Sequence, residues 1–189
     1  MHSVDPVEKL QGLLNPVGDE EAGAAVAVLL KRAGGGLQVL LVKRATSPID
    51  PWSGDMAFPG GRRRLEDRGL KETVIRETME ETGIDLRRCR FLGTLGVVAS
   101  TVAPELGVLP FVVLCGETPV VTLSEELSSY FWVPFEQLKQ SRGMAWVDRG
   151  EVPAYLVGGE VVWGLTYRML ENLLQLTEKT TCREAGSPG

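Results

Sequence analysis

The sequence predicts a single domain that mixes α-helices and β-strands. Its 189 residues, 43% of them hydrophobic and 24% charged, are enough to bury one sizeable core. Short apolar runs bounded by glycine or proline, typical of strands, alternate with stretches whose apolar residues recur every three or four positions, typical of helices. We expect one domain over residues 1–189, with a helix and connector in about residues 1–20 and a frayed tail over about residues 178–189.

The first predicted element is a short amphipathic helix. Within residues 4–14, Val7, Leu10 and Leu13 fall on one helical face, and Pro16 follows the segment. This apolar face could contact a second copy of the chain in a homodimer, and it could equally cover the core of its own chain.

Two strands joined by a turn follow the helix. The runs 24–30 (AAVAVLL) and 36–42 (GLQVLLV) are separated by glycines at positions 34–36, which predicts a hairpin. A glycine run can also cradle phosphates, but no Lys-Ser or Lys-Thr pair follows this one and no helix pattern begins after it. The turn is therefore the better interpretation.

The rest of the chain continues the alternation. Further strands are expected at residues 56–59, 91–100, 108–115, 120–122, 130–134, 153–157 and 161–163, the last two as a hairpin with a Gly-Gly turn. Helical segments are expected before Gly83 and at residues 124–127, 135–138 and 165–176. Residues 101–107 should form a loop near the substrate.

Composition and charge exclude several classes of function. The net charge of -5 gives no basic surface of the kind that binds nucleic-acid polymers. The single histidine, His2, excludes histidine-based triads and histidine-ligated zinc, and three cysteines without CxxC spacing argue against a disulfide framework. No apolar run is long enough to span a membrane and no signal-peptide pattern is present, so we expect a cytoplasmic protein with no membrane partner.

The stretch over residues 58–84, FPGGRRRLEDRGLKETVIRETMEETGI, carries the candidate chemistry. A Gly-Gly turn leads through a charged loop into the helix that ends at Gly83. Successive helical residues are about 100° apart, so Glu77, Glu80 and Glu81 share one face. Three carboxylates are thus gathered on one side of a single helix.

On the other side of this helix, Ile75 and Met79 should pack against the core. Three carboxylates without partners would repel one another, and a hard divalent cation such as Mg²⁺ or Mn²⁺, which prefers oxygen ligands, would remove that cost. A glutamate-rich helix can also be simply a solvated face. The flanking residues favour the metal site.

Those flanking residues resemble the signature of the Nudix hydrolases, in which Gly, five residues, Glu and seven residues precede Arg-Glu-aliphatic-x-Glu-Glu-x-Gly-aliphatic. Residues 76–84, RETMEETGI, match the second half, with Thr78 in place of the aliphatic residue. Gly61 and Asp67 each stand one position earlier than the glycine and glutamate of the strict first half. One extra residue between Asp67 and Arg76 explains both shifts. The same insertion is a feature of the coenzyme A pyrophosphatase branch, whose box is similar to GGRxDPEDAxxxxxALREAxEEVGL.

Two other stretches also resemble that branch. Residues 40–45 (LLVKRA) with residues 57–61 (AFPGG) are similar to its LLTxRSxxxRxHxGQVAFPGG, and residues 163–170 (WGLTYRML) are similar to its IWGLTARIL. Between the first two matched pieces the chain departs, with Asp55 where the branch has glutamine. The resemblance implies the Nudix α/β/α sandwich, a mixed sheet between helices.

The resemblance also implies a metal site. Glu77, Glu80, Glu81 and the carbonyl of Gly60 would hold Mg²⁺ or Mn²⁺, with Glu77 and Glu81 taking part in catalysis. Arg76 would orient a glutamate of the box rather than touch substrate.

A further carboxylate is expected from outside the box. Glu126, eight residues before the proline of the WVP sequence, matches a glutamate of the relatives, and either Glu126 or Glu77 could take a proton from water. Glu126 could instead complement a helix dipole. The run of three arginines at 62–64 could hold phosphates or be a solvated charge run. The residues expected to contact substrate are Arg44, Phe58, Gly61 and Arg62.

The function that this resemblance implies is metal-dependent hydrolysis of a diphosphate linkage in a small-molecule nucleoside diphosphate derivative. Coenzyme A or an acyl-coenzyme A is the leading substrate. ADP-ribose, other nucleotide sugars, dinucleoside polyphosphates and nucleoside triphosphates stay open. A function of another class is also open, a nucleotide-binding regulator without catalysis, and the loss of one carboxylate would have favoured it. All three carboxylates are present.

Overall fold

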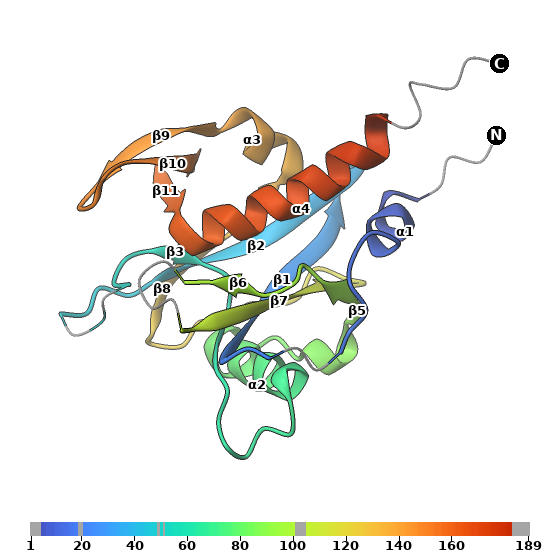
Figure 1. Cartoon of the computed structure of the whole chain (residues 1–189), viewed down its shortest axis with the longest axis horizontal. Helices are drawn as coiled ribbons and strands as arrows, with labels where there is room; N and C mark the ends of the chain where they lie inside the picture. The colour runs from blue at the N-terminus through green and yellow to red at the C-terminus, as the bar shows by residue number, and fades with distance from the viewer. Residues whose placement is uncertain (1–4, 19–20, 49, 51, 101–104, 183–189) are drawn as a thin grey trace.

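The computed structural model describes residues 5–18, 21–48, 50, 52–100 and 105–182. Within these residues, eight strands form one mixed sheet whose main path has the order β3-β2-β1-β7-β5 (Figure 1). Three further pairings complete it, β4 with β1, β6 with β7 and β8 with β2. The strands are β1 (Ala24–Ala33), β2 (Gly36–Arg44), β3 (Met56–Ala57), β4 (Gly60–Arg62), β5 (Arg90–Thr94), β6 (Val98–Ala99), β7 (Gly107–Leu114) and β8 (Leu127–Pro134).

The β1–β2 hairpin confirms the prediction made from the two apolar runs. Ala33 pairs with Gly36, which leaves Gly34 and Gly35 as a two-residue turn with φ of 57° and 79°. Such left-handed φ values suit the twist of a tight hairpin and favour glycine. On its other edge β1 runs parallel to β7, so the sheet is mixed.

Alternate side chains of β1 enter two apolar cores, one on each face of the sheet. Val28 and Leu30 lie in one core, and Ala27 and Leu29 lie in the other. The first core is covered by the helices α1 (Pro6–Gln11), α3 (Phe135–Gln140) and α4 (Gly164–Cys182), and the second by α2 (Leu70–Thr82) and the short 3₁₀ helix η1 (Leu86–Arg88) (Figure 1). The predicted α/β/α arrangement is confirmed.

A second, three-stranded sheet has the order β11-β10-β9. Its strands are β9 (Arg142–Val147), β10 (Gly150–Val157) and β11 (Glu160–Trp163). The β10–β11 hairpin with its turn at Gly158 and Gly159 confirms the prediction. β9 was not predicted from the sequence, because its side chains are largely exposed and give no apolar alternation.

Several predicted boundaries are wrong. The strand expected over 91–100 is interrupted after Thr94 and resumes as β6, with Gly96 at φ 78° between them. Residues 120–122 form no strand, because this segment crosses past the end of α2, where the Thr122 N–H donates to the Thr82 carbonyl at 2.8 Å. The helical turn expected at 124–127 is a turn that leads directly into β8.

The terminal helices also differ from the prediction. α1 covers Pro6–Gln11 instead of residues 4–14, and its Val7 and Leu10 are fully buried. Its apolar face therefore covers the core of its own chain. α4 continues to Cys182, past the predicted end at 176, so part of the expected frayed tail is helical. No helix among the described residues is long and apolar enough to cross a membrane.

Candidate active site

The helix α2 presents the acidic residues to the sheet. It ends at Gly83, as predicted, where φ is 71° and the Gly83 N–H donates to the Met79 carbonyl. The prediction that Met79 packs against the core was wrong, because Met79 is 47% exposed, whereas Ile75 is partly buried and packs against the second core as predicted. The buried positions of this helix include Val74 and Thr78. The carboxylate of this helix that lies closest to the sheet accepts a hydrogen bond from β4.

That carboxylate is Glu81, which is buried and accepts a hydrogen bond from the Gly60 N–H at 2.9 Å. Burial raises the pKa of Glu81 to about 7, and the negative charges of Glu77 and Glu126 add to this effect, while the Gly60 hydrogen bond and the charge of Arg44 oppose it. The charged form of Glu81 is therefore disfavoured mainly by burial.

The two glycines of β4 allow this close approach. At Gly60, φ is 146°, and a Cβ would lie 2.3 Å from the Ala25 carbonyl oxygen. At Gly61, a Cβ would lie 2.6 Å from the Glu77 carboxylate. Glycine at both positions lets the strand pass between β1 and the acidic face of α2.

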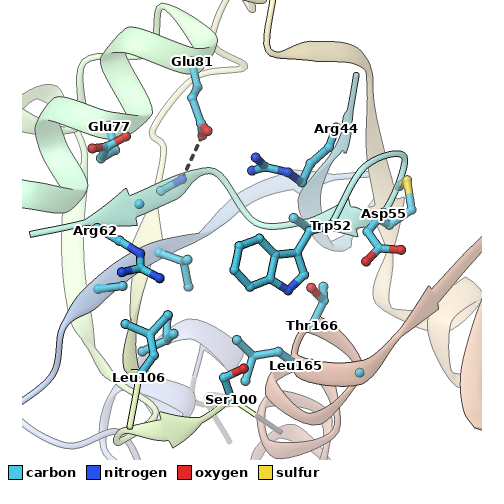
Figure 2. A pocket seen from close by; sticks show the side chains of 18 of the residues that line it. Arg44, Trp52, Asp55, Arg62, Glu77, Glu81, Ser100, Leu106, Leu165 and Thr166 are labelled. Carbon is cyan, nitrogen blue, oxygen red and sulfur yellow. Dashed lines mark hydrogen bonds between the residues drawn. The ribbon is translucent and has the colours of Figure 1, made fainter. Parts of the chain in front are cut away.

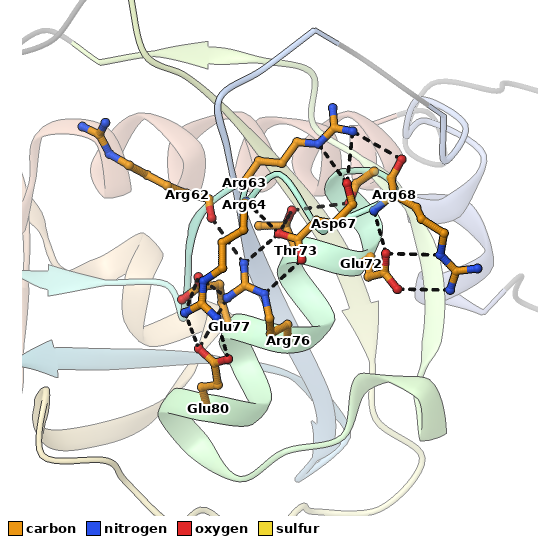
Figure 3. Close-up of polar contacts among 11 residues, drawn as sticks. Arg62, Arg63, Arg64, Asp67, Arg68, Glu72, Thr73, Arg76, Glu77 and Glu80 are labelled. Atoms are coloured by element: carbon orange, nitrogen blue, oxygen red, sulfur yellow. Dashed lines mark hydrogen bonds and ion pairs between the residues drawn. The ribbon is translucent and has the colours of Figure 1, made fainter.

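Glu80 shares its arginine partners with Glu77, because Arg76 Nη1 donates to Glu77 and also to Glu80 Oε2 at 3.4 Å. Arg64 forms two hydrogen bonds to its carboxylate, with Nη2–Oε2 at 3.0 Å, and the Glu80 side chain is 46% exposed (Figure 3). Glu80 is not among the residues that line the cavity described below. Its role as a metal ligand stays a prediction that requires the Arg64 contact to open.

Arg76 holds the charged loop against the helix (Figure 3). Its guanidinium binds both oxygens of Asp67, with Nε–Oδ1 at 3.0 Å and Nη2–Oδ2 at 2.7 Å, and also donates to Glu77. Asp67 further accepts from the Arg64 N–H and the Thr73 hydroxyl, each at 2.9 Å. These contacts fit the positioning role expected of Arg76.

Asp67 is the partner that sequence reasoning did not assign. Its side chain is only 5% exposed, and the hydrogen bonds from Arg76 hold its pKa well below the usual range. Asp67 stands one position earlier than the glutamate of the Nudix signature, and this match was the sequence feature that pointed to it. The sequence did not indicate that Asp67 fixes Arg76 and the loop.

Between β4, α2 and the start of α4 lies a cavity of about 360 Å³ (Figure 2). Glu77, Glu81 and Glu126 contribute carboxylates to its lining, and Arg44 and Arg62 contribute guanidinium groups. Gly60 and Gly61 also line it. Most of the sequence-predicted site residues, from four separate segments of the chain, therefore meet in one place.

The arginines of the predicted site differ in their surroundings. Arg62 lines the cavity, whereas Arg63 donates to the carbonyls of Asp67 and Arg68 and Arg64 binds Glu80. Thus one member of the run is placed for a ligand, and two organise the loop. Arg44 lines the cavity while its Nε donates to Asp50 at 2.8 Å.

Phe58 is placed differently from the expectation. It is 4% exposed and packs in the core beneath α4, and it is not among the residues that line the cavity. The two residues before it, Met56 and Ala57 of β3, line the cavity instead.

Trp52 and Asp55, on the far wall, were not among the predicted site residues. Trp52 (Figure 2) and Trp163 both line the cavity, and the Trp163 indole N–H donates to Asp55 at 3.0 Å. Burial raises the pKa of Asp55 above its usual value, and the Trp163 hydrogen bond opposes that rise. A tryptophan within the Pro-, Ser- and Gly-rich loop before β3 was the signal that could have indicated this wall.

The donor chemistry of the site can be compared with the needs of a divalent cation. Within the described part of the chain, no group of three or more carboxylate, cysteine or histidine side chains is close enough to hold a metal ion. The carboxylates of Glu77 and Glu81 nevertheless share the cavity, and burial raises the pKa of Glu81. Carboxylates are hard oxygen donors of the kind that Mg²⁺ and Mn²⁺ prefer.

A mixed sheet between helices, with an acidic helix and two arginines around one cavity, defines a hydrolase that acts on phosphoanhydrides. The sequence pattern of the NUDIX domain matches residues 21–155, and the chain belongs to this family of pyrophosphohydrolases. Hydrolases of this family generally use divalent metal ions.

Individual relatives are similar over different shares of the chain. The human (Homo sapiens) mitochondrial coenzyme A diphosphatase is 32% identical over 167 residues, which is 82% of this chain and 69% of that protein. An uncharacterized protein of Schizosaccharomyces pombe is 41% identical over 107 residues, 53% of this chain, and the match spans only 32% of that longer relative.

The solved structures support the fold. The crystal structure of a Nudix hydrolase from M. smegmatis, RenU, superimposes with a TM-score of 0.56 at 18% identity, and covers 86% of each chain. At this level of identity the likeness concerns the fold alone.

Proposed function

We propose that this chain hydrolyses the diphosphate linkage of coenzyme A or of an acyl-coenzyme A. The observation that carries the proposal is the joint lining of one cavity by four carboxylates, two arginines and two tryptophans. This set offers sites for a cation, for phosphates and for an apolar or aromatic group. The similarity to the human coenzyme A diphosphatase supports this choice of substrate.

Glu77 and Glu81, with the carbonyl of Gly60, would hold Mg²⁺ or Mn²⁺. When bound, the ion would neutralise charge on the diphosphate and make water a stronger nucleophile. Arg44 and Arg62 would neutralise the remaining phosphate charge from the other side of the cavity. The aromatic faces of Trp52 and Trp163 would contact the nucleoside or another flat part of the substrate.

Glu126 is our candidate for the general base. The Glu77 carboxylate accepts a hydrogen bond from Arg76, which fixes its position, whereas Glu126 lines the cavity from the turn before β8. The Glu126 carbonyl accepts from the Ala45 N–H at 2.8 Å, which fixes this turn to the end of β2. Arg76 would act by positioning Glu77 and the loop, without contact to substrate.

The test is a panel of coenzyme A, acetyl-coenzyme A, ADP-ribose, diadenosine tetraphosphate and nucleoside triphosphates, each incubated with Mg²⁺ and analysed by chromatography. Turnover of the coenzyme A compounds, reduced roughly 10³-fold in Glu81→Gln, would support the proposal. Preferred turnover of another compound would replace the substrate. Binding without turnover across the panel would favour the nucleotide-binding regulator.

A further inference from the structure

Cys89 and Cys115 lie side by side at an end of the sheet that the proposed reaction does not use. Their Sγ atoms are 3.1 Å apart. Val108, at the start of β7, lines the cavity, while Cys115 follows the last residue of the same strand. At about 3.3 Å per residue, the cysteine pair is therefore roughly 20 Å from the cavity.

The strand register explains why these two cysteines meet. Cys89 immediately precedes β5, Cys115 immediately follows β7, and Arg90 pairs with Leu114 in the antiparallel ladder. The next pair outward in that register is Cys89 with Cys115. The contact is thus a consequence of backbone pairing between two strands of the main sheet, independent of side-chain rotamers in loops.

The backbone geometry at this pair suits a disulfide. The Cys89 N–H donates to Leu86 at 3.1 Å and the Cys115 N–H donates to Leu30 at 2.8 Å, so neither amide bonds to the other cysteine. In antiparallel pairs of this kind the Cα atoms are about 4.5 Å apart, within the range of roughly 4.4 to 6.8 Å that disulfides span. The two sulfurs need to approach by only about 1 Å to bond.

We propose that Cys89 and Cys115 form a reversible disulfide when the protein meets a disulfide oxidant such as oxidised glutathione. The Cys89 thiolate attacks one sulfur of the oxidant, which forms a mixed disulfide and releases one glutathione thiol. Cys115 then gives up its proton and attacks the Cys89 sulfur, which releases the second glutathione. Two protein thiols lose two electrons and two protons, and one glutathione disulfide becomes two thiols.

The surroundings of the two thiols set this order of attack. Cys89 is partly exposed and can meet the oxidant, whereas Cys115 is buried. The hydrogen bond between them lowers the pKa of Cys89 and, together with burial, raises the pKa of Cys115. The accessible thiol is thus also the one that ionises first.

The bond would close the segment from residue 89 to residue 115 into a loop. This segment includes β5, β6 and β7 and carries three residues of the cavity lining, Ser100, Leu106 and Val108. The disulfide lies at the opposite end of β7 from the cavity, and its formation therefore restrains the segment that carries one wall of the cavity. This effect does not depend on which substrate the cavity binds.

The test uses the full chain in a series of reduced and oxidised glutathione mixtures, followed by thiol blocking, intact mass and peptide mapping. Wild type and Cys182→Ser should lose two hydrogens and yield a peptide that joins positions 89 and 115, and dithiothreitol should reverse both changes. Cys89→Ser and Cys89→Ala should show no such peptide. Oxidation should raise the melting temperature of the wild type and leave that of Cys89→Ala unchanged, because the bond constrains the unfolded chain.

Three results would overturn the proposal. The wild type could carry glutathione on Cys89 without an internal bond, the bond could form only after denaturation, or Cys182→Ser could abolish it. The Cys89 variants change a partly exposed side chain, so they are expected to fold, and a circular dichroism spectrum equal to that of the wild type provides the check.

Discussion

At the scale of single residues, the pairing of Asp67 with Arg76 joins stability to the geometry of the active site. Both side chains are largely removed from solvent, at 5% and 20% exposure, and the guanidinium also contacts Glu77. Breaking a buried pair by neutralising one partner leaves an uncompensated charge. The position of Glu77 in the cavity therefore depends on a carboxylate that does not itself line the cavity.

Asp67→Asn is expected to lower the free energy of unfolding by about 3 kcal/mol near neutral pH. The pKa of Asp67 is lowered in the folded state, so its contribution is fully present above its usual value of 3.8 and is lost as pH falls through the folded pKa. Denaturant unfolding from about pH 5 down to about pH 2 should show a shallower acid loss in the variant. Asp85→Asn, which breaks a surface pair with Arg87, is the control and should change little.

Two threonines on α2 offer a matched comparison at the same scale. Thr78 and Thr82 are both fully buried, but the Thr78 hydroxyl has no hydrogen-bond partner among the described residues, whereas the Thr82 hydroxyl donates to the Thr78 carbonyl at 2.6 Å. A buried hydroxyl without a partner carries the cost of its lost hydration.

Thr78→Val should therefore raise the free energy of unfolding by about 1 kcal/mol, and Thr82→Val should lower it by about the same amount. Denaturant titration of the two variants measures both changes. Equal destabilisation by both would show that the Thr78 hydroxyl has a partner, such as a water molecule.

At the scale of elements, the second sheet contributes directly to the cavity. β11 ends at Trp163, whose indole N–H binds Asp55 beside β3, although the two residues are 108 positions apart. This hydrogen bond ties the loop that carries Trp52 to the start of α4. The far wall of the cavity thus depends on contact between the two sheets.

Trp163→Phe should weaken this wall, because it removes the N–H donor and leaves the partly buried Asp55 carboxyl without that partner. We expect a loss of about 1 kcal/mol in the free energy of unfolding and a several-fold rise in KM, with a smaller change in kcat. Trp146→Phe is the control, since Trp146 on β9 is 79% exposed and outside the cavity. Identical kinetics for the wild type and Trp163→Phe would contradict the role of this wall.

At the scale of the whole molecule, the features that the sequence predicted are those with local signals. Glycine turns between apolar runs indicated the hairpins, and the left-handed glycine at 83 indicated the end of α2. The features that were missed depend on distant partners. The burial of Glu81 depends on the Gly60 amide, and the contact between Asp55 and Trp163 joins different sheets. The spacing of apolar residues along the sequence does not indicate contacts between residues that are far apart in the chain.

Two expectations about the whole molecule stay predictions. A homodimer would be detected by light scattering coupled to size-exclusion chromatography. The cytoplasmic location would be tested by cell fractionation.

A divalent cation should stabilise the whole molecule through the cavity. At a Mg²⁺ concentration one hundred times its Kd, the free energy of unfolding should rise by about 2.7 kcal/mol, and chelation by EDTA should reverse the rise in melting temperature. Glu81→Gln should reduce this response, whereas Glu117→Gln, at an exposed position outside the cavity, should retain it. An equal response in both variants would show that the ion binds elsewhere.

The parallel pairing of β1 with β7 also bears on how the chain is made. During synthesis β1 and β2 emerge before the other strands and can form their hairpin. The sheet is complete only when β7 and β8 have been made, because Ala24 of β1 pairs with Val108 of β7 and Leu40 of β2 pairs with Trp132 of β8. Loop closure over such separations slows folding. A ribosome-bound nascent chain that ends before β8 would therefore expose the apolar edges of this hairpin, and it would be the form of the protein that most needs a chaperone.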